Sequence, residues 1–260
     1  MEAMTQTDAL PIAGAEFRER AIFDTQVQTL AALGFRFTPD CRVLDYGCGD
    51  GWLVRDYANR GVQAYGCDVI LPDTPACREL QAQGLIAPMT GEPPRVPFPN
   101  GMFDLVTSNM VFEHVRDYDA AFSELGRVLM PGGVMMHVFA ARYSLLEQHS
   151  FVPLASIVQS YGWLYLWAAL GIRNEFQKGC TAAQTARRNH KYLRENTRYP
   201  TKRRISRLAR RYFDDVAFRE DVYLKFTPKG RRLPEFLRCR LVAALYGATR
   251  ASVLVASKTH

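Results

Sequence analysis

Apolar side chains recur along residues 17–140 at two different spacings, which predict a chain that alternates between helices and strands. The helical spacing is found in 17–33, 52–59, 74–83 and 119–130. Short apolar runs that predict strands are found at 41–46, 62–68, 85–87, 102–108 and 134–140. Because strands that alternate with helices form parallel sheets covered on both faces, the pattern predicts an α/β fold.

This alternation stops after residue 142. Residues 143–212 predict mostly helix, with an aromatic stretch at 161–172 and a basic stretch at 187–211. The aromatic stretch is too short to span a bilayer, and we expect it to pack as a cap helix; sugar stacking or shallow attachment to a membrane surface is the alternative. Strand patterns return at 216–226 and 252–256, and we expect these two strands to pair antiparallel.

The predicted fold is a seven-stranded, mostly parallel sheet with helices on both faces and a helical cap inserted after the fifth strand. We expect four parts along the chain: an N-terminal helical segment (1–36), a cofactor-binding core (37–142), a substrate-binding helical cap (143–212), and C-terminal strands and a helix that complete the core (213–260).

A glycine-rich loop follows the first predicted strand, and its sequence is Asp45-Tyr46-Gly47-Cys48-Gly49-Asp50-Gly51. Its Gly-x-Gly-x-Gly spacing differs from the Gly-x-Gly-x-x-Gly of dinucleotide sites, although a dehydrogenase loop remains the alternative. Asp68 ends the second predicted strand, close to the usual distance for a carboxylate that binds ribose hydroxyls. The two features predict a nucleoside ligand at the carboxyl ends of the strands.

Four motifs between residues 38 and 141 resemble the class I S-adenosylmethionine (SAM)-dependent methyltransferases: the loop at 43–51, Asp68, the segment 97–115 and the turn at 129–133. The resemblance implies a Rossmann-like fold, with SAM as cofactor and S-adenosylhomocysteine as product. Residues 88–92 depart from the family's polar adenine contact, and we assign that contact to Met89, with Thr90 as the alternative. The implied cofactor contacts are Asp45, Gly47, Cys48, Gly49, Gly51, Asp68, Val69, Met89, Asn109 and Met110.

Methyl transfer to a hydroxyl needs alignment and a base. His149 and Glu147 lie just beyond the fifth predicted strand, and His114 follows the fourth. A neutral histidine titrates in the right range, so we predict His149 as the base, with Glu147 and His114 in support. The alternative is that His149 caps or packs the first cap helix and that His114 is a packing residue.

The formal charge of +7 and the basic stretch predict an anionic acceptor, because arginine binds phosphate or carboxylate through two hydrogen bonds. A solvated helix face is the alternative for part of the stretch. The predicted acceptor contacts are Arg142, Tyr143, Arg198 and Tyr199. Residues 109–112 lack the Asn/Asp-Pro-Pro-aromatic pattern of nucleobase methyltransferases, which disfavours nucleic acid as a substrate.

These patterns favour O-methylation of a sugar or glycan-type small-molecule acceptor. Two alternatives remain: a lipid-like or quinone acceptor, with peripheral contact to a membrane, and a non-catalytic module of the same fold that binds RNA or a protein partner. The six cysteines form no Cys-x-x-Cys pair, and no histidines stand at zinc-site spacing, so we expect no metal site. The opening stretch to residue 16 lacks the pattern of a secretory signal, which predicts a cytoplasmic protein, with the inner face of the membrane as the alternative location.

Overall fold

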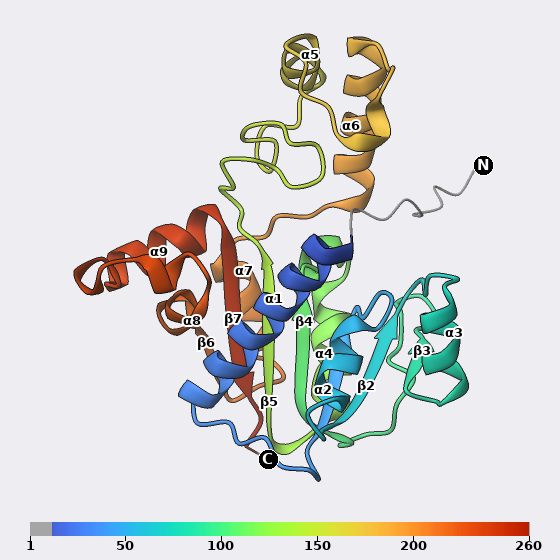
Figure 1. The fold of residues 1–260 in the computed structure, drawn as a ribbon, viewed down its shortest axis with the longest axis vertical. Coiled ribbons are helices and arrows are strands. Elements are labelled where there is room, and N and C mark those ends of the chain that lie inside the picture. Colours follow the sequence, from blue (N-terminus) through green and yellow to red (C-terminus); the bar gives the residue numbers. More distant parts are fainter. Residues whose placement is uncertain (1–11, 260) are drawn as a thin grey trace.

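The computed structural model describes residues 12–259, so the first 11 residues of the opening stretch lie outside the described part. One seven-stranded sheet forms the centre of the molecule (Figure 1), in the order β3-β2-β1-β4-β5-β7-β6. The strands are β1 (Arg42–Tyr46), β2 (Gln63–Asp68), β3 (Ile86–Pro88), β4 (Phe103–Asn109), β5 (Leu129–Ala140), β6 (Asp215–Phe218) and β7 (Ala251–Ser257). Strands β1 to β5 pair in parallel, and β7 pairs antiparallel with β5 and β6. The predicted fold class is confirmed.

Helices cover both faces of this sheet. The described helices, including the cap helices α5 and α6, are α1 (Ile12–Ala32), α2 (Trp52–Ala58), α3 (Pro75–Ala82), α4 (Tyr118–Val128), α5 (Tyr161–Ala169), α6 (Ala182–Asn196), α7 (Lys202–Ala209), α8 (Glu220–Phe226) and α9 (Arg240–Thr249). Single 3-10 turns are η1 (Phe112–His114), η2 (Glu175–Gln177), η3 (Gly230–Arg232) and η4 (Glu235–Leu237). Successive strand residues Val43 and Leu44 face two separate core clusters, as expected when side chains alternate across a sheet.

Two predicted segments differ from the structure. The strand predicted at 216–226 ends at Phe218, and the chain then forms α8. Glu220 and Asp221 lie in the first turn of this helix, where carboxylates are favourable next to the positive end of the helix dipole. Helix α7, which we expected in the cap, contributes Ile205 and Ala209 to the core cluster that contains α4, and so lies in the helix layer of the sheet.

The cap helices α5 and α6 pack against each other above the carboxyl ends of β4 and β5 (Figure 1). Their contact is a small apolar cluster that includes Leu164, Ala186 and Leu193, with Trp163 and Trp167 packed against it. One side of the aromatic stretch packs within the cap, as expected, whereas Tyr165, Leu166 and Leu170 on its other side are exposed. Within residues 12–259, no helix is both long and apolar enough to cross a membrane.

Candidate functional site

The glycine loop between β1 and α2 makes a turn that only glycine fits at position 47. Gly47 has a φ of 80°, and a Cβ there would stand 2.4 Å from a methyl group of Val111. The backbone N–H groups of Gly47 and Cys48 both donate to the carbonyl of Cys67 at the end of β2. The loop is thereby fixed at the carboxyl edge of the sheet, beside the neighbouring strand end.

Asp68, the last residue of β2, faces this loop. Its carboxylate accepts hydrogen bonds from the backbone N–H of Gly49 at 2.9 Å and of Ile70 at 3.4 Å. The next residues, Val69 and Ile70, are exposed apolar side chains. A carboxylate next to exposed apolar groups suits the hydroxyls and the base of a nucleoside, so the predicted roles of Asp68 and Val69 agree with the geometry.

Asp45 adds a third carboxyl group, beside those of Asp68 and Asp50, to the carboxyl edge of the sheet. Its side chain is only 4% exposed, and burial, followed by the nearby charges of Asp68 and Asp50, raises its pKa to about 8. A ligand that brings positive charge would relieve this repulsion. SAM carries an ammonium group, a sulfonium and a ribose diol, so the residues present fit this cofactor.

Two predicted cofactor contacts, Cys48 and Met89, have side chains that are buried in the core. The Cys48 side chain is buried among core residues, where burial raises the pKa of its thiol, so only its backbone can contact a ligand. Met89 also packs in a core cluster, with its backbone N–H donating to the carbonyl of Asp68. The adenine contact of Met89 stays a prediction.

The end of β4 contains a strained residue. Met110 has a φ of 55°, which a residue with a side chain rarely adopts, and its N–H donates to the carbonyl of Val138 at 2.7 Å. Backbone strain of this kind is concentrated at binding and catalytic sites. Asn109 and Met110, both predicted cofactor contacts, therefore lie where β4 turns away from the sheet beside the glycine loop.

Directly after this turn, Glu113 and His114 meet His149 from the cap loop. One ligand-type atom from each of the three side chains lies within 4.8 Å of the others, and the two imidazole rings are 5.1 Å apart. Burial lowers the pKa of His149, and the neighbouring His114 lowers it further, whereas the charge of Glu147 raises it. The net lowering favours a neutral ring. The structure brings the predicted His114 and His149 together and adds Glu113, which sequence reasoning missed although it adjoins His114.

Glu147, predicted to support His149, has a fully hydrogen-bonded carboxylate. Its buried carboxylate accepts hydrogen bonds from the backbone N–H groups of His149 and Ser150, from the Ser150 hydroxyl at 2.6 Å and from the Tyr199 hydroxyl at 2.7 Å. Because both oxygens are occupied, Glu147 is a positioning residue that holds the His149 loop and Tyr199 in place.

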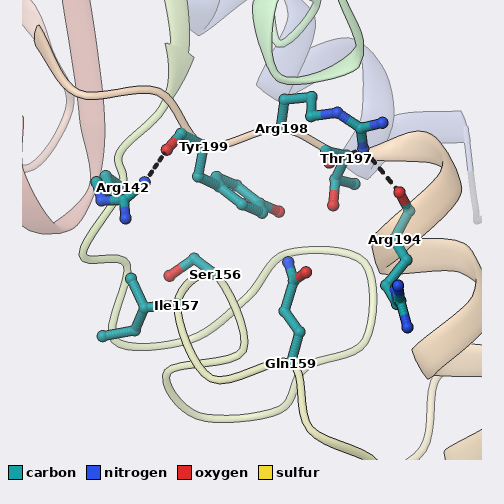
Figure 2. Close-up of a pocket in the computed structure, with 8 residues that line it drawn as sticks. All are labelled: Arg142, Ser156, Ile157, Gln159, Arg194, Thr197, Arg198 and Tyr199. Carbon is teal, nitrogen blue, oxygen red and sulfur yellow. Dashed lines mark hydrogen bonds between the residues drawn. The ribbon is translucent and has the colours of Figure 1, made fainter. Parts of the chain in front are cut away.

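A cavity of about 360 Å³ opens between the end of β5 and the end of α6 (Figure 2). Arginines line both of its sides: Arg142 stands near Tyr199 on one side, and Arg194 and Arg198 stand on the other. The remaining lining residues are Ser156, Ile157, Gln159 and Thr197. The backbone N–H of Arg198 donates to the carbonyl of Glu113 at 2.5 Å, so the cavity adjoins the Glu113, His114 and His149 group.

Three of the four predicted acceptor contacts, Arg142, Arg198 and Tyr199, line this cavity. Tyr143 does not: its ring is exposed outside the lining, and its N–H donates to the carbonyl of Ala248 in α9. The prediction for Tyr143 is wrong for this cavity because the chain turns toward α9 directly after Arg142.

The sequence of this chain is similar to those of known proteins. Residues 44–137 match a family model described as a methyltransferase domain. A demethylmenaquinone methyltransferase from Beutenbergia cavernae is 32% identical over 155 residues, covering 56% of this chain and 63% of the relative. A malonyl-[acyl-carrier protein] O-methyltransferase from Serratia marcescens is 33% identical over 109 residues, or 42% of each chain. The chain thus spans between about two fifths and two thirds of the length of these relatives.

A solved structure supports the fold across nearly the whole chain. Phosphoethanolamine N-methyltransferase 2 from Haemonchus contortus, in complex with phosphomonomethylethanolamine and S-adenosylhomocysteine, has a TM-score of 0.51 at 18% identity, covering 91% of this chain and 53% of that one. The family match assigns residues 44–137 to a methyltransferase domain, and the sheet order and the fit of the glycine loop to SAM agree with the class I SAM-dependent methyltransferases.

Proposed function

We propose that this chain transfers a methyl group from SAM to a hydroxyl of a sugar or glycan-type acceptor that carries a carboxylate or phosphate. The observation that carries this proposal is the cavity with Arg142, Arg194 and Arg198 in its wall, close to the carboxyl edge of the sheet. Guanidinium groups pair with carboxylate and phosphate in a planar, two-bonded geometry. Hydroxyl and amide groups from Ser156 and Gln159 add donors and acceptors that suit a polyhydroxylated ligand.

SAM supplies a methyl group made electrophilic by its sulfonium. An acceptor oxygen uses a lone pair to form the new C–O bond, the electrons of the S–C bond stay on sulfur, and the hydroxyl proton passes to solvent. The residues of this chain align the acceptor, which is the main contribution that an in-line transfer needs. Glu113, His114 and His149 come together directly after β4, and the backbone bond from Arg198 to Glu113 connects this group to the cavity wall.

The cavity assignment predicts a specific kinetic change. An acceptor would first be found by screening nucleotide sugars, glycans and lipid-linked sugars with labelled SAM. Arg194→Gln combined with Arg198→Gln should then raise the KM for this acceptor about 100-fold or more, because at least two hydrogen bonds to a charged group are lost and each contributes about 1.5–3 kcal/mol. The affinity for SAM, measured by calorimetry, should stay within about twofold, since neither arginine contacts the glycine loop.

A matched control removes the same amount of positive charge from α6, the helix that contains Arg194. Arg187 and Lys191 are exposed on α6 outside the cavity lining, so Arg187→Gln combined with Lys191→Gln should leave the acceptor KM unchanged. An equal rise of KM in both double variants would mean that general positive charge attracts the acceptor, and the cavity would lose its assignment.

A lipid-like or quinone acceptor is the second candidate, favoured by the exposed face of α9. Leu241 and Leu245 lie one helical turn apart and are 78% and 62% exposed, and Phe236 precedes them on η4. Basic residues lie close to these positions in the sequence: Arg231, Arg232, Arg238 and Arg240. Apolar side chains flanked by arginine are typical of segments that rest on anionic lipid.

This candidate predicts binding to vesicles. The full chain should sediment with vesicles of equal parts phosphatidylglycerol and phosphatidylcholine at low salt, and Leu241→Ser combined with Leu245→Ser should return most of it to the supernatant. Leu170→Ser, a change of an exposed leucine at the end of α5, serves as the control and should sediment like the original chain. Failure of the original chain to sediment would eliminate the lipid candidate.

A further inference from the structure

We propose that Glu113, His114 and His149 bind a divalent transition-metal cation, and that this cation binds the acceptor oxygen that is methylated. The inference rests on the proposed function for the role of the cation, but the cation site itself depends only on the three side chains. Their ligand-type atoms lie within 4.8 Å of one another, although the residues come from η1 and from the cap loop.

The tautomer of His114 leaves a nitrogen free for a metal. Its Nδ1 stands 2.8 Å from the carbonyl oxygen of Asn196, which can only accept, so Nδ1 carries the proton and donates it. Nε2 therefore carries the lone pair. Metal-ligating histidines commonly donate their other N–H to a carbonyl in this way, which fixes the ring for coordination.

His149 is held in a similar manner. Its Nδ1 lies 3.4 Å from the Tyr192 hydroxyl, and its backbone N–H donates to Glu147. When Nδ1–H donates to that hydroxyl, Nε2 of His149 is also free to bind a cation. Glu147 and Tyr192 thus act as residues that orient the second imidazole.

Glu113 supplies the observation that points to a ligand. Its side chain is 1% exposed, and among the described residues its buried Oε2 has no hydrogen-bond partner. A buried carboxylate oxygen without a partner is costly, because it has lost water and gained nothing in exchange. A cation held between this oxygen and the two imidazoles would satisfy it.

The ligand types favour a particular class of metal. Two imidazoles and one carboxylate are typical of zinc and of other first-row divalent ions, whereas magnesium and calcium prefer oxygen ligands. Ligand atoms around a tetrahedral ion bound at about 2.1 Å stand roughly 3.4 Å apart. Because the His114 side chain is exposed, it can shift toward the ion while its Nδ1–H still donates to the carbonyl of Asn196.

Three protein ligands leave an open coordination position for the acceptor. A metal-bound hydroxyl has a lowered pKa, so its proton can pass to solvent and the resulting oxygen can attack the methyl carbon of SAM. The backbone bond from Arg198 to Glu113 places the arginine-lined cavity directly beside this position. The arginines would then bind the anionic group of the acceptor while the cation binds the reacting hydroxyl.

The test uses zinc and the full chain, first stripped with a chelator and then dialysed. Calorimetry should find one zinc ion per chain, and Glu113→Gln and His149→Ala should each weaken zinc binding at least about 10-fold. Glu113→Gln preserves the shape of the buried side chain, so its thermal unfolding should stay close to that of the original chain. His190→Ala changes a cap histidine outside the three-residue group and should leave zinc affinity unchanged.

Cobalt provides a second measurement that separates this site from cysteine. Bound Co²⁺ should show visible absorption without a thiolate charge-transfer band, because no cysteine belongs to the group of Glu113, His114 and His149. Among the described cysteines, Cys180 and Cys239 are the two that are not buried, and neither belongs to this group. Absence of zinc binding, or binding that survives both variants, would overturn the cation site. If the original chain binds zinc but transfers no methyl group to any screened acceptor, the proposed function is overturned instead.

Discussion

Replacement of Asp68 by alanine is expected to weaken SAM binding by about 100-fold or more. The variant loses the two hydrogen bonds from the ribose hydroxyls to the carboxylate, and each contributes about 1.5–3 kcal/mol. In the structure the Asp68 carboxylate also accepts the N–H of Gly49 at 2.9 Å. The change therefore removes both the acceptor for the ribose hydroxyls and an anchor of the glycine loop. Calorimetric titration of SAM into the variant measures the effect.

Asp73 offers a control for this variant. It lies five residues further along the chain, where its exposed carboxylate pairs with Arg78 on the surface. Exposed ion pairs of this kind contribute little, so Asp73→Ala should bind SAM within about twofold of the original affinity. Near-original affinity in a folded Asp68→Ala variant would remove Asp68 from the ribose role.

Asp45→Asn should act on stability and on cofactor binding in opposite directions. Burial and the charges of Asp68 and Asp50 raise the pKa of Asp45 to about 8, far above its ordinary value of 3.8. Between these two pH values the unfolded chain releases a proton that the folded chain retains, so the cofactor-free protein loses stability as the pH rises. Asparagine cannot ionise, and the variant should escape this loss.

Thermal and denaturant unfolding at several pH values test this expectation. The free energy of unfolding of Asp45→Asn should exceed that of the original chain by a few kcal/mol at pH 8, and the gap should shrink toward pH 4. SAM affinity should fall about 10-fold or more at pH 8, because the charge that faces the cationic cofactor is gone. A stability difference that stays constant with pH would contradict the raised pKa.

The core of the fold could be predicted because its signals are local. Each strand from β1 to β5 coincides with a short apolar run in the sequence. The glycine loop, Asp68 and the β4 motif occur in an order that specifies one cofactor. Helix α8 was missed because its buried residues, Val222, Tyr223 and Leu224, are consecutive and lack helical spacing. Its packing beside α1 and α9 decides the conformation.

The acceptor side of the site was harder to predict because it depends on distant contacts. Glu147 and His149 have equally suitable side chains in the sequence, and only the fold shows that Ser150 and Tyr199 occupy the Glu147 carboxylate. The expectation of no metal rested on local spacing. His114 and His149 meet only through the return of the cap loop over η1, which no sequence spacing reveals.

Calorimetric titration of the full chain with SAM tests the central claim most directly. We expect one SAM per chain, with binding lost in Asp68→Ala and retained in Asp73→Ala. The absence of SAM binding by a chain whose circular dichroism confirms a folded α/β protein would contradict the assignment of the glycine loop to this cofactor.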